Sequence, residues 1–173
     1  MLNFIRGAVV TAVIGCLVYG GLLVHASRTS HERILPLGEA YHFCGLYLDC
    51  HLSAAVDGVE VTDLPNGGQR YTVRVRFASD AARATLVLSH PEATLLDANG
   101  RRFGPVEGPH GVELIPEQAI LAEFVFESPE VLSSPRLQVA KGGFLEKISE
   151  RLLVGDPDSF GHAPVTLALS PSP

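Results

Sequence analysis

Basic residues are scarce in this sequence and nowhere clustered. The 173 residues include 13 Lys plus Arg against 19 Asp plus Glu, which gives a formal net charge of −6. Proteins that bind nucleic acid gather their basic residues on one face or along one helix. Because no such cluster is present, nucleic acid is not an expected partner.

The short motifs that mark common enzyme classes are also missing. The sequence contains no Gly-x-Ser-x-Gly nucleophile elbow, no Walker loop, no His-Glu-x-x-His helix and no cysteine with the flanking pattern of a protease nucleophile. Internal repeats are absent as well. We therefore expect neither an enzyme nor a bound cofactor.

Glycine and proline are plentiful, at 17 and 12 residues, yet they stay below the share of about 25 to 30% that marks low-complexity disorder. Hydrophobic residues make up 46% of the chain. A chain this apolar can bury a core, and its length suits one domain of about 100 to 200 residues. The composition predicts a folded domain with many turns.

The mean hydropathy of +0.23 is high for such a turn-rich chain, and one block accounts for much of it. Residues 7–26 carry no formal charge and lie between Arg6 and Arg28. At about 1.5 Å per residue, this block forms a helix of roughly 30 Å, the thickness of a hydrocarbon core. Without residues 1–26 the remainder has 12 basic against 19 acidic residues, a net charge of −7.

Three interpretations of the N-terminal block stay open. We favour a retained single-pass anchor, because a secretory h-region is usually nearer 7 to 15 residues. A cleaved signal peptide is the second interpretation, since residues 24–26 (Val-His-Ala) suit a peptidase. The third is a lipoprotein, because residues 13–16 (Val-Ile-Gly-Cys) resemble a lipobox, although mostly apolar residues follow Cys16.

Charge hardly decides the orientation of an anchor, because Arg6 and the free amino terminus on one side are matched by Arg28 and Arg33 on the other. The order of n-region, h-region and possible cleavage site is that of an exported protein. Cys44 and Cys50 would suit an oxidising compartment. We expect a single-pass protein of the inner membrane with a periplasmic C-terminal domain, or alternatively a secreted protein.

The rest of the chain alternates short apolar runs with turn residues, which is typical of an all-β domain. Residues 71–77 are the clearest strand, with Tyr, Val, Val and Phe on one face and Thr, Arg and Arg on the other. Turns are predicted at 65–68 and 97–100, where the Asn-Gly pair at 99–100 should supply the positive φ angles of a tight hairpin. Further strands are predicted at 52–61 (broken at Asp57-Gly58), 84–88, 93–96, 119–127, 137–140 and 165–169.

One segment has helical spacing instead. In residues 144–154, Leu145, Ile148 and Leu152 recur on one face and Gly155 follows. The expected organisation is a transmembrane or signal segment at 1–26, a polar linker at 27–38, a β-sandwich at 39–170 that includes this short helix, and a tail at 171–173.

Four stretches, 71–77, 94–103, 114–117 and 124–129, resemble the telokin-like, immunoglobulin-type β-sandwich domains of exported bacterial proteins. The resemblance implies an immunoglobulin-like sandwich. Members of that group are largely of unknown function and often follow a signal peptide, lipobox or membrane helix, so the likeness implies a fold more than an activity. The sequence departs from the group at 78–80, where an Asn-Gly turn is common, and in an insertion at 141–163.

The densest group of reactive side chains is His42, Cys44, Cys50 and His51. These four could ligate zinc or copper, but the spacing matches no common finger or ribbon. A disulfide between Cys44 and Cys50 is the simpler interpretation, provided the chain turns between them, because bonded cysteines need Cα atoms within roughly 7 Å. Unpaired cysteines packed in the fold are the third possibility.

The remaining polar candidates have simpler explanations. His90 and His110 lie beside prolines in expected loops. Asp97 and Asn99 could contact calcium, together with Asp156 and Asp158, but an Asp-x-Asn-Gly run also suits a hairpin turn. Arg74 and Arg76 are expected on a solvated strand face.

These observations favour a membrane-anchored or exported, non-catalytic binding or structural module of the bacterial cell envelope. Residues 7–26 would contact the membrane, and loops on a rigid sandwich would contact a protein partner. The alternative is a metal-handling envelope protein that uses His42, Cys44, Cys50 and His51.

Overall fold

The computed structural model describes residues 2–43, 51–83, 85–88, 91–140 and 163–170. Within these residues the chain forms one helix and eleven strands. Their order is α1 (Leu2–Thr29), β1 (Arg33–Leu35), β2 (Tyr41–Phe43), β3 (Leu52–Asp63), β4 (Gln69–Ser79), β5 (Leu86–Leu88), β6 (Glu92–Leu96), β7 (Arg102–Phe103), β8 (Val112–Leu114), β9 (Ala119–Ser128), β10 (Arg136–Ala140) and β11 (Val165–Ala168).

The strands build a β-sandwich. One sheet has the order β1-β11-β10-β6-β7, a second has the order β2-β3-β4-β9, and β5 pairs with β8 in a two-stranded sheet. Buried side chains from all three sheets form one hydrophobic core, whose largest fully buried members are Tyr71, Phe43, Phe77, Phe124 and Phe126. The mainly β fold expected from the sequence is therefore confirmed, while its immunoglobulin type stays a prediction.

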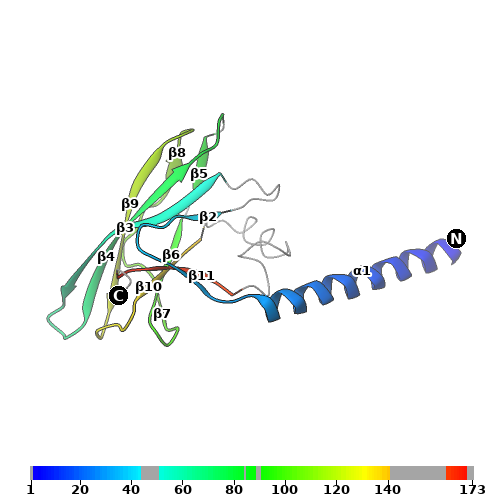
Figure 1. The fold of residues 1–173 in the computed structure, drawn as a ribbon, viewed down its shortest axis with the longest axis horizontal. Helices are drawn as coiled ribbons and strands as arrows, with labels where there is room; N and C mark the ends of the chain where they lie inside the picture. Colours follow the sequence, from blue (N-terminus) through cyan, green and yellow to red (C-terminus); the bar gives the residue numbers. More distant parts are fainter. Residues whose placement is uncertain (1, 44–50, 84, 89–90, 141–162, 171–173) are drawn as a thin grey trace.

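Helix α1 projects away from the sandwich (Figure 1). Its segment Arg6–Thr29 is long and apolar enough to cross a membrane, and an 18-residue window of it has a mean hydropathy of 2.2 with no residue buried in the fold. Ala26, near the end of the helix, is buried. Hydroxyl groups of α1 bond back to the helix, as Thr11 does to the carbonyl of Gly7 at 3.0 Å and Thr29 to that of His25 at 2.9 Å. Such internal bonds suit apolar surroundings, where water offers no partner.

The strand expected at 71–77 lies within β4, where Tyr71, Val73, Val75 and Phe77 are buried and the side chains between them face outward. The break expected at Asp57-Gly58 is a β-bulge inside the continuous strand β3. A Cβ on Gly58 would lie 2.6 Å from the Arg74 side chain, so the bulge brings backbone and guanidinium together at a residue without a side chain.

The hairpin expected at Asn99-Gly100 differs from the prediction of two positive φ angles. Gly100 has a φ of 78°, but Asn99 is not among the described non-glycine residues with positive φ. The Asp97 carboxylate accepts the backbone N–H groups of Asn99 and Arg101, both at 2.8 Å. These bonds stabilise a longer loop that ends in a left-handed glycine, in place of a two-residue turn.

Residues 27–38, expected to be a linker, contain the end of α1 and strand β1. Only Ser30–Glu32 separate the helix from the strand. β1 pairs in parallel with β11, with Leu35 opposite Leu167, and the buried Leu35 side chain belongs to the core. The helix expected at 144–154 lies outside the described residues.

Candidate functional site

The candidate site is a groove along strand β9, the last strand of the four-stranded sheet. Its residues pair with β4 over Ala119 to Ser128, and the side chains of Ala122, Phe124 and Phe126 point into the core. Successive side chains of a strand point to opposite faces, so Leu121, Glu123 and Val125 share the outer face. Leu121 is 58% exposed, whereas Val125 is 8% exposed.

The outer edge of β9 is paired at only one described position. Val125 donates its N–H to the carbonyl of Glu107 at 2.9 Å and accepts from Val106 at 2.8 Å, in an antiparallel bridge. On the other edge, the carbonyl of Gln118 accepts from Ser79 of β4. Backbone groups alternate between the two edges along a strand, so Ala119, Leu121 and Glu123 direct theirs toward the open edge.

Those three residues have no backbone partner on that edge among the described parts of the chain. The turn that joins β8 to β9 closes with a bond from Gln118 N–H to the Ile115 carbonyl at 3.1 Å. Beyond that turn, β8 pairs with β5 and not with β9. The two strands therefore leave a gap beside β9.

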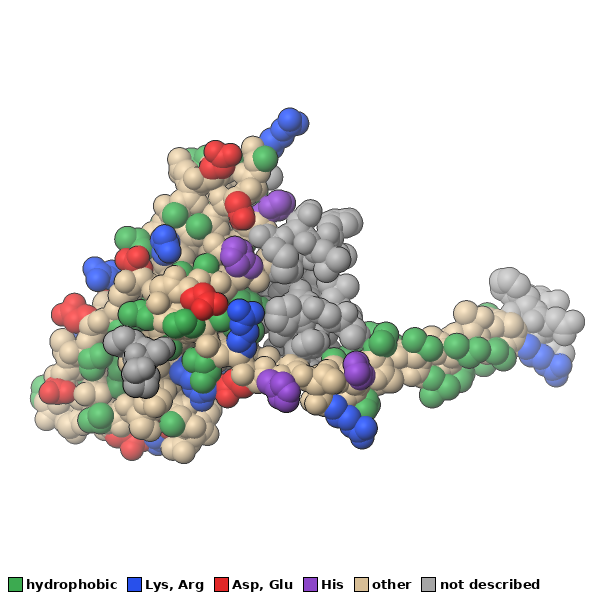
Figure 2. Space-filling view, in the orientation of Figure 1, with side chains coloured by type: hydrophobic (Ala, Val, Ile, Leu, Met, Phe, Trp, Pro, Cys, Tyr) green, Lys and Arg blue, Asp and Glu red, His purple; other side chains and the backbone are tan. Residues whose placement is uncertain are grey.

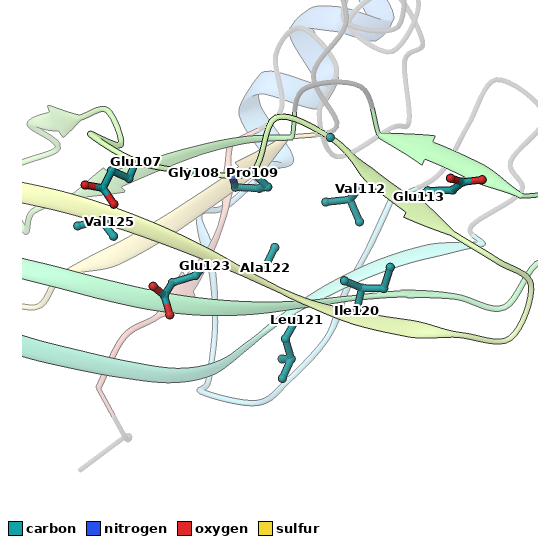
Figure 3. Close-up of a pocket in the computed structure, with 11 residues that line it drawn as sticks. Glu107, Gly108, Pro109, Val112, Glu113, Ile120, Leu121, Ala122, Glu123 and Val125 are labelled. Atoms are coloured by element: carbon teal, nitrogen blue, oxygen red, sulfur yellow. The ribbon is translucent and has the colours of Figure 1, made fainter.

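This gap is a groove of about 560 Å³ (Figure 3). Apolar side chains from both strands line it: Val112, Ile120, Leu121 and Ala122. Its polar lining is acidic, from Glu107, Glu113 and Glu123. In Figure 3, Glu107 and Glu123 lie toward one end of the groove and Glu113 toward the other.

Arg70 of β4 lies near this groove but is paired with a residue outside it. Arg70 forms an ion pair with Glu127 at 2.6 Å. The hydrogen bond that the Arg70 guanidinium donates to Glu127 raises the pKa of Arg70, with further contributions from the negative charges of Glu127 and Glu107. Glu113 and Glu123 form no ion pair with any described residue. Arg74 lies opposite Glu123 on β4, but its guanidinium lies over Gly58 of β3.

The cluster proposed as a disulfide, or alternatively as a metal site, is only partly described. His42 is exposed on β2 and His51 is exposed just before β3, while Cys44 and Cys50 lie outside the described residues. Phe43 lies opposite Leu52 in the antiparallel pairing of β2 and β3. Within the described residues no three His, Cys, Asp or Glu side chains gather as metal ligands. The disulfide and the metal site stay predictions.

His42 does line a second hollow, of about 300 Å³, where the helix meets the sandwich. Ser30, His31, Arg33 and Tyr41 line it too. Arg33 is held by Glu39 at 3.4 Å. The structure thus brings His42 close to His31 and Arg33, a neighbourhood that the sequence pattern did not indicate.

The Asp97 carboxylate is engaged in hydrogen bonds within its own turn. The side chain is buried, and besides the two backbone N–H groups it accepts a bond from Arg101 Nε at 2.6 Å. These bonds explain the residue as a turn stabiliser, and the calcium contact stays a prediction. Arg74 and Arg76 are exposed on the outer sheet face, as expected. His110 is exposed in a loop, and His90, Asp156 and Asp158 lie outside the described residues.

The sequence interpretation missed the groove. One signal was available, because Ile120 and Leu121 are adjacent apolar residues that break the strict alternation of a half-buried strand. That break indicates an apolar side chain on the solvent face. It does not reveal which segment lies opposite, which depends on the path of residues 104–114.

Comparison with known proteins gives similarity in fold only. No family model matches the sequence, and no curated protein matches it. Among solved structures, an uncharacterised β-sandwich protein from Clostridium difficile 630 has 8% identity and a TM-score of 0.48, covering 82% of this chain and 96% of its own. The secreted protein MPT63 from Mycobacterium tuberculosis has 11% identity and a TM-score of 0.49, covering 66% and 93% respectively.

Proposed function

We propose that this chain is a membrane-anchored, non-catalytic binding module of the bacterial cell envelope, with its β-sandwich held against the extracytoplasmic membrane face. The observation that carries the proposal is the exposed apolar helix α1 and its very short connection to the sandwich. Figure 2 shows hydrophobic side chains along the visible side of this helix, with basic side chains near both ends.

The connection is fixed as well as short. From Thr29 to Arg33 the chain can extend at most about 14 Å. Ser30 Oγ accepts a bond from the Ala163 N–H at 2.7 Å, which joins the helix end to the segment before β11. If α1 spans a bilayer, the sandwich is held within one domain's width of the headgroups.

Binding fits the described residues better than catalysis. Arg70, Asp97 and Arg101 have displaced pKa values, and each is engaged in an ion pair or a turn. Catalytic groups usually combine a displaced pKa with a position in a cleft. The groove along β9 instead offers unpaired backbone and acidic side chains, which are features of a recognition surface.

Membrane fractionation of the full chain tests the anchor. We expect the protein in the membrane fraction after an alkaline wash, with residues 1–26 present in its intact mass. Leu17 and Leu22 are exposed on α1, so replacing both with arginine should release the protein, because each charge at a bilayer centre costs about 2.5 to 3.5 kcal/mol on insertion scales. Replacing both with isoleucine is the matched control.

Two outcomes would overturn parts of the proposal. A soluble mature protein without residues 1–26 would replace the anchor with a cleaved signal and a secreted domain. A sandwich that resists protease in intact spheroplasts, but is digested after lysis, would reverse the proposed orientation.

A further inference from the structure

Strand β9 has an unusually long open edge for this fold. The other edge strands of the two large sheets, β1, β2 and β7, are only two or three residues long, whereas β9 has ten residues. Short edge strands are one way in which proteins avoid pairing with other chains. The first half of β9 lacks this protection and also lies beside a groove.

We propose that the β9 edge binds an extended peptide segment of a partner protein by antiparallel strand addition, and that this segment carries lysine or arginine at alternate positions. The backbone groups of Ala119, Leu121 and Glu123 would bond the added strand. At about 3.3 Å per residue, the open edge accommodates a segment of about five residues.

The antiparallel direction follows from the sheet. β2, β3, β4 and β9 pair antiparallel throughout, and the bridge between Glu107 and Val125 is antiparallel too. A peptide in that direction continues the pairing that this bridge begins. Each peptide residue opposite Leu121 or Glu123 would exchange both backbone bonds with it and place its side chain on the same outer face.

The side chains around the edge define the peptide pattern. On the outer face, the carboxylate of Glu123 has no ion-pair partner among the described residues, and Glu107 lies at the same end of the groove. Lysine or arginine facing them would balance this charge. On the opposite face, Ile120, Ala122 and Val112 line the groove and fit apolar peptide side chains. Basic and apolar residues should therefore alternate.

Charge also disfavours a second copy of this chain as the occupant. Pairing two β9 edges would bring two acidic grooves together, and each chain carries a net charge of −6. Like charges brought close across an interface cost binding free energy. The negative charge that repels a second copy attracts a basic peptide.

This inference rests on the binding role proposed above, but its test does not depend on the anchor. The probe is a fluorescent peptide of about seven residues that alternates lysine and valine, with both ends blocked. Anisotropy measures its binding to the full chain in nonionic detergent micelles. If the anchor proposal is wrong, membrane fractionation shows it, whereas if strand addition is wrong, the anisotropy measurement shows it.

Modified peptides test the antiparallel geometry of strand addition. In antiparallel addition the lysines exchange backbone bonds with β9, so N-methylation of the lysines should abolish binding, while N-methylation of the valines should preserve it. A peptide with glutamate in place of lysine should not bind. A peptide of the same composition with its lysines in one block should bind at least threefold more weakly.

The protein variants test the site. Glu123→Lys should weaken binding roughly threefold to tenfold, the scale of one exposed charge pair reversed. Glu60→Lys is the matched control, because Glu60 is exposed on β3, away from the β9 edge, and the change in net charge is identical. Circular dichroism confirms that each variant is folded.

Several results would overturn the inference. These are no binding of the lysine-valine peptide, equal binding of both N-methylated peptides, or equal weakening by the two lysine variants. Loss of binding only on N-methylation of the valines would overturn the antiparallel geometry. Stable self-association of the chain that the peptide does not displace would assign the edge to a second copy.

Discussion

The hydroxyl of Tyr71 should contribute measurably to the stability of the sandwich. Tyr71 is 2% exposed, and its hydroxyl donates to Gln69 Oε1 at 2.6 Å and accepts from the Leu132 N–H at 3.2 Å. Leu132 is itself buried, in the loop between β9 and β10. Tyr71→Phe keeps the packed ring and removes only the hydroxyl.

The two hydrogen bonds lost in Tyr71→Phe contribute unequally to stability. Gln69 is only partly buried and its amide also bonds Asp63, so water can replace the hydroxyl there. The Leu132 N–H is buried and is left without that partner, which costs about 1 to 3 kcal/mol. At about 2 to 4 °C per kcal/mol, the melting temperature should fall by several degrees.

Thermal unfolding followed by circular dichroism measures this loss, with the full chain in detergent micelles. Hydrogen exchange at the Leu132 amide gives a local readout and should accelerate in Tyr71→Phe. Gln69→Ala is the control, because it removes the other bond and leaves the Leu132 N–H satisfied. If Tyr71→Phe costs no more stability than Gln69→Ala, or if exchange at Leu132 is unchanged, the reasoning is refuted.

Three further predictions concern turns and the core. Burial tends to raise the pKa of Asp97, but the bonds from the Arg101 side chain and the backbone amides of Arg101 and Asn99 lower it below 3.8 overall. A lowered folded-state pKa stabilises the fold above the unfolded-state pKa, and this stabilisation is lost as pH falls through the folded-state pKa. The difference in stability between wild type and Asp97→Asn should therefore be largest near neutral pH and shrink below the usual carboxyl pKa of 3.8 in acid denaturation. Gly67→Ala should destabilise the fold by about 1 to 2 kcal/mol, because Gly67 has a φ of 83° with open space around it. Gly68→Ala should destabilise it more, since the added Cβ would lie 2.2 Å from the Ser128 carbonyl oxygen. Equal melting temperatures for the two variants would contradict this. Thr166 is fully buried and its Oγ1 has no hydrogen-bond partner in the described structure, so Thr166→Val should stabilise the fold by about 1 kcal/mol in urea titrations; a loss of stability would show that the hydroxyl is bonded.

Turn chemistry illustrates how far local sequence predicts structure. The Asn-Gly pairs at 66–67 and 99–100 mark the two chain reversals correctly, and both glycines have positive φ. The turn type at 99–100 was wrong because the Asp97 carboxylate binds two backbone amides. A side chain that accepts several N–H groups stabilises a longer loop, and this competes with the two-residue turn that the dipeptide alone predicts.

The short strands were harder to predict. β1, β2 and β8 have three residues each and were not among the predicted strands. A three-residue segment carries too little periodicity to distinguish a strand from a loop. These segments become strands because a partner is available, as β11 is for β1 and β5 is for β8.

The candidate site was also predictable from the sequence only in part. Glu123 and Leu121 belong to a strand that the sequence predicted, so their place on its outer face follows from alternation. The groove does not follow, because it requires β8 to pair with β5 and diverge from β9 after a shared turn. The His42, Cys44, Cys50 and His51 hypothesis was drawn from residue types alone, and it stays a prediction.

The sequence by itself determined the apolar helix, the mainly β character, the strong strand at the centre of the second sheet and the positions of the main turns. These features depend on local hydrophobic period, length and turn residues, which act within a few positions of the chain. The tertiary structure alone decided that β1 joins β11, that the helix ends three residues before the sandwich, and that β9 keeps an open edge. Each of these depends on which backbone donors and acceptors find partners far away in the chain, and strand pairing over such separations leaves no local pattern to read.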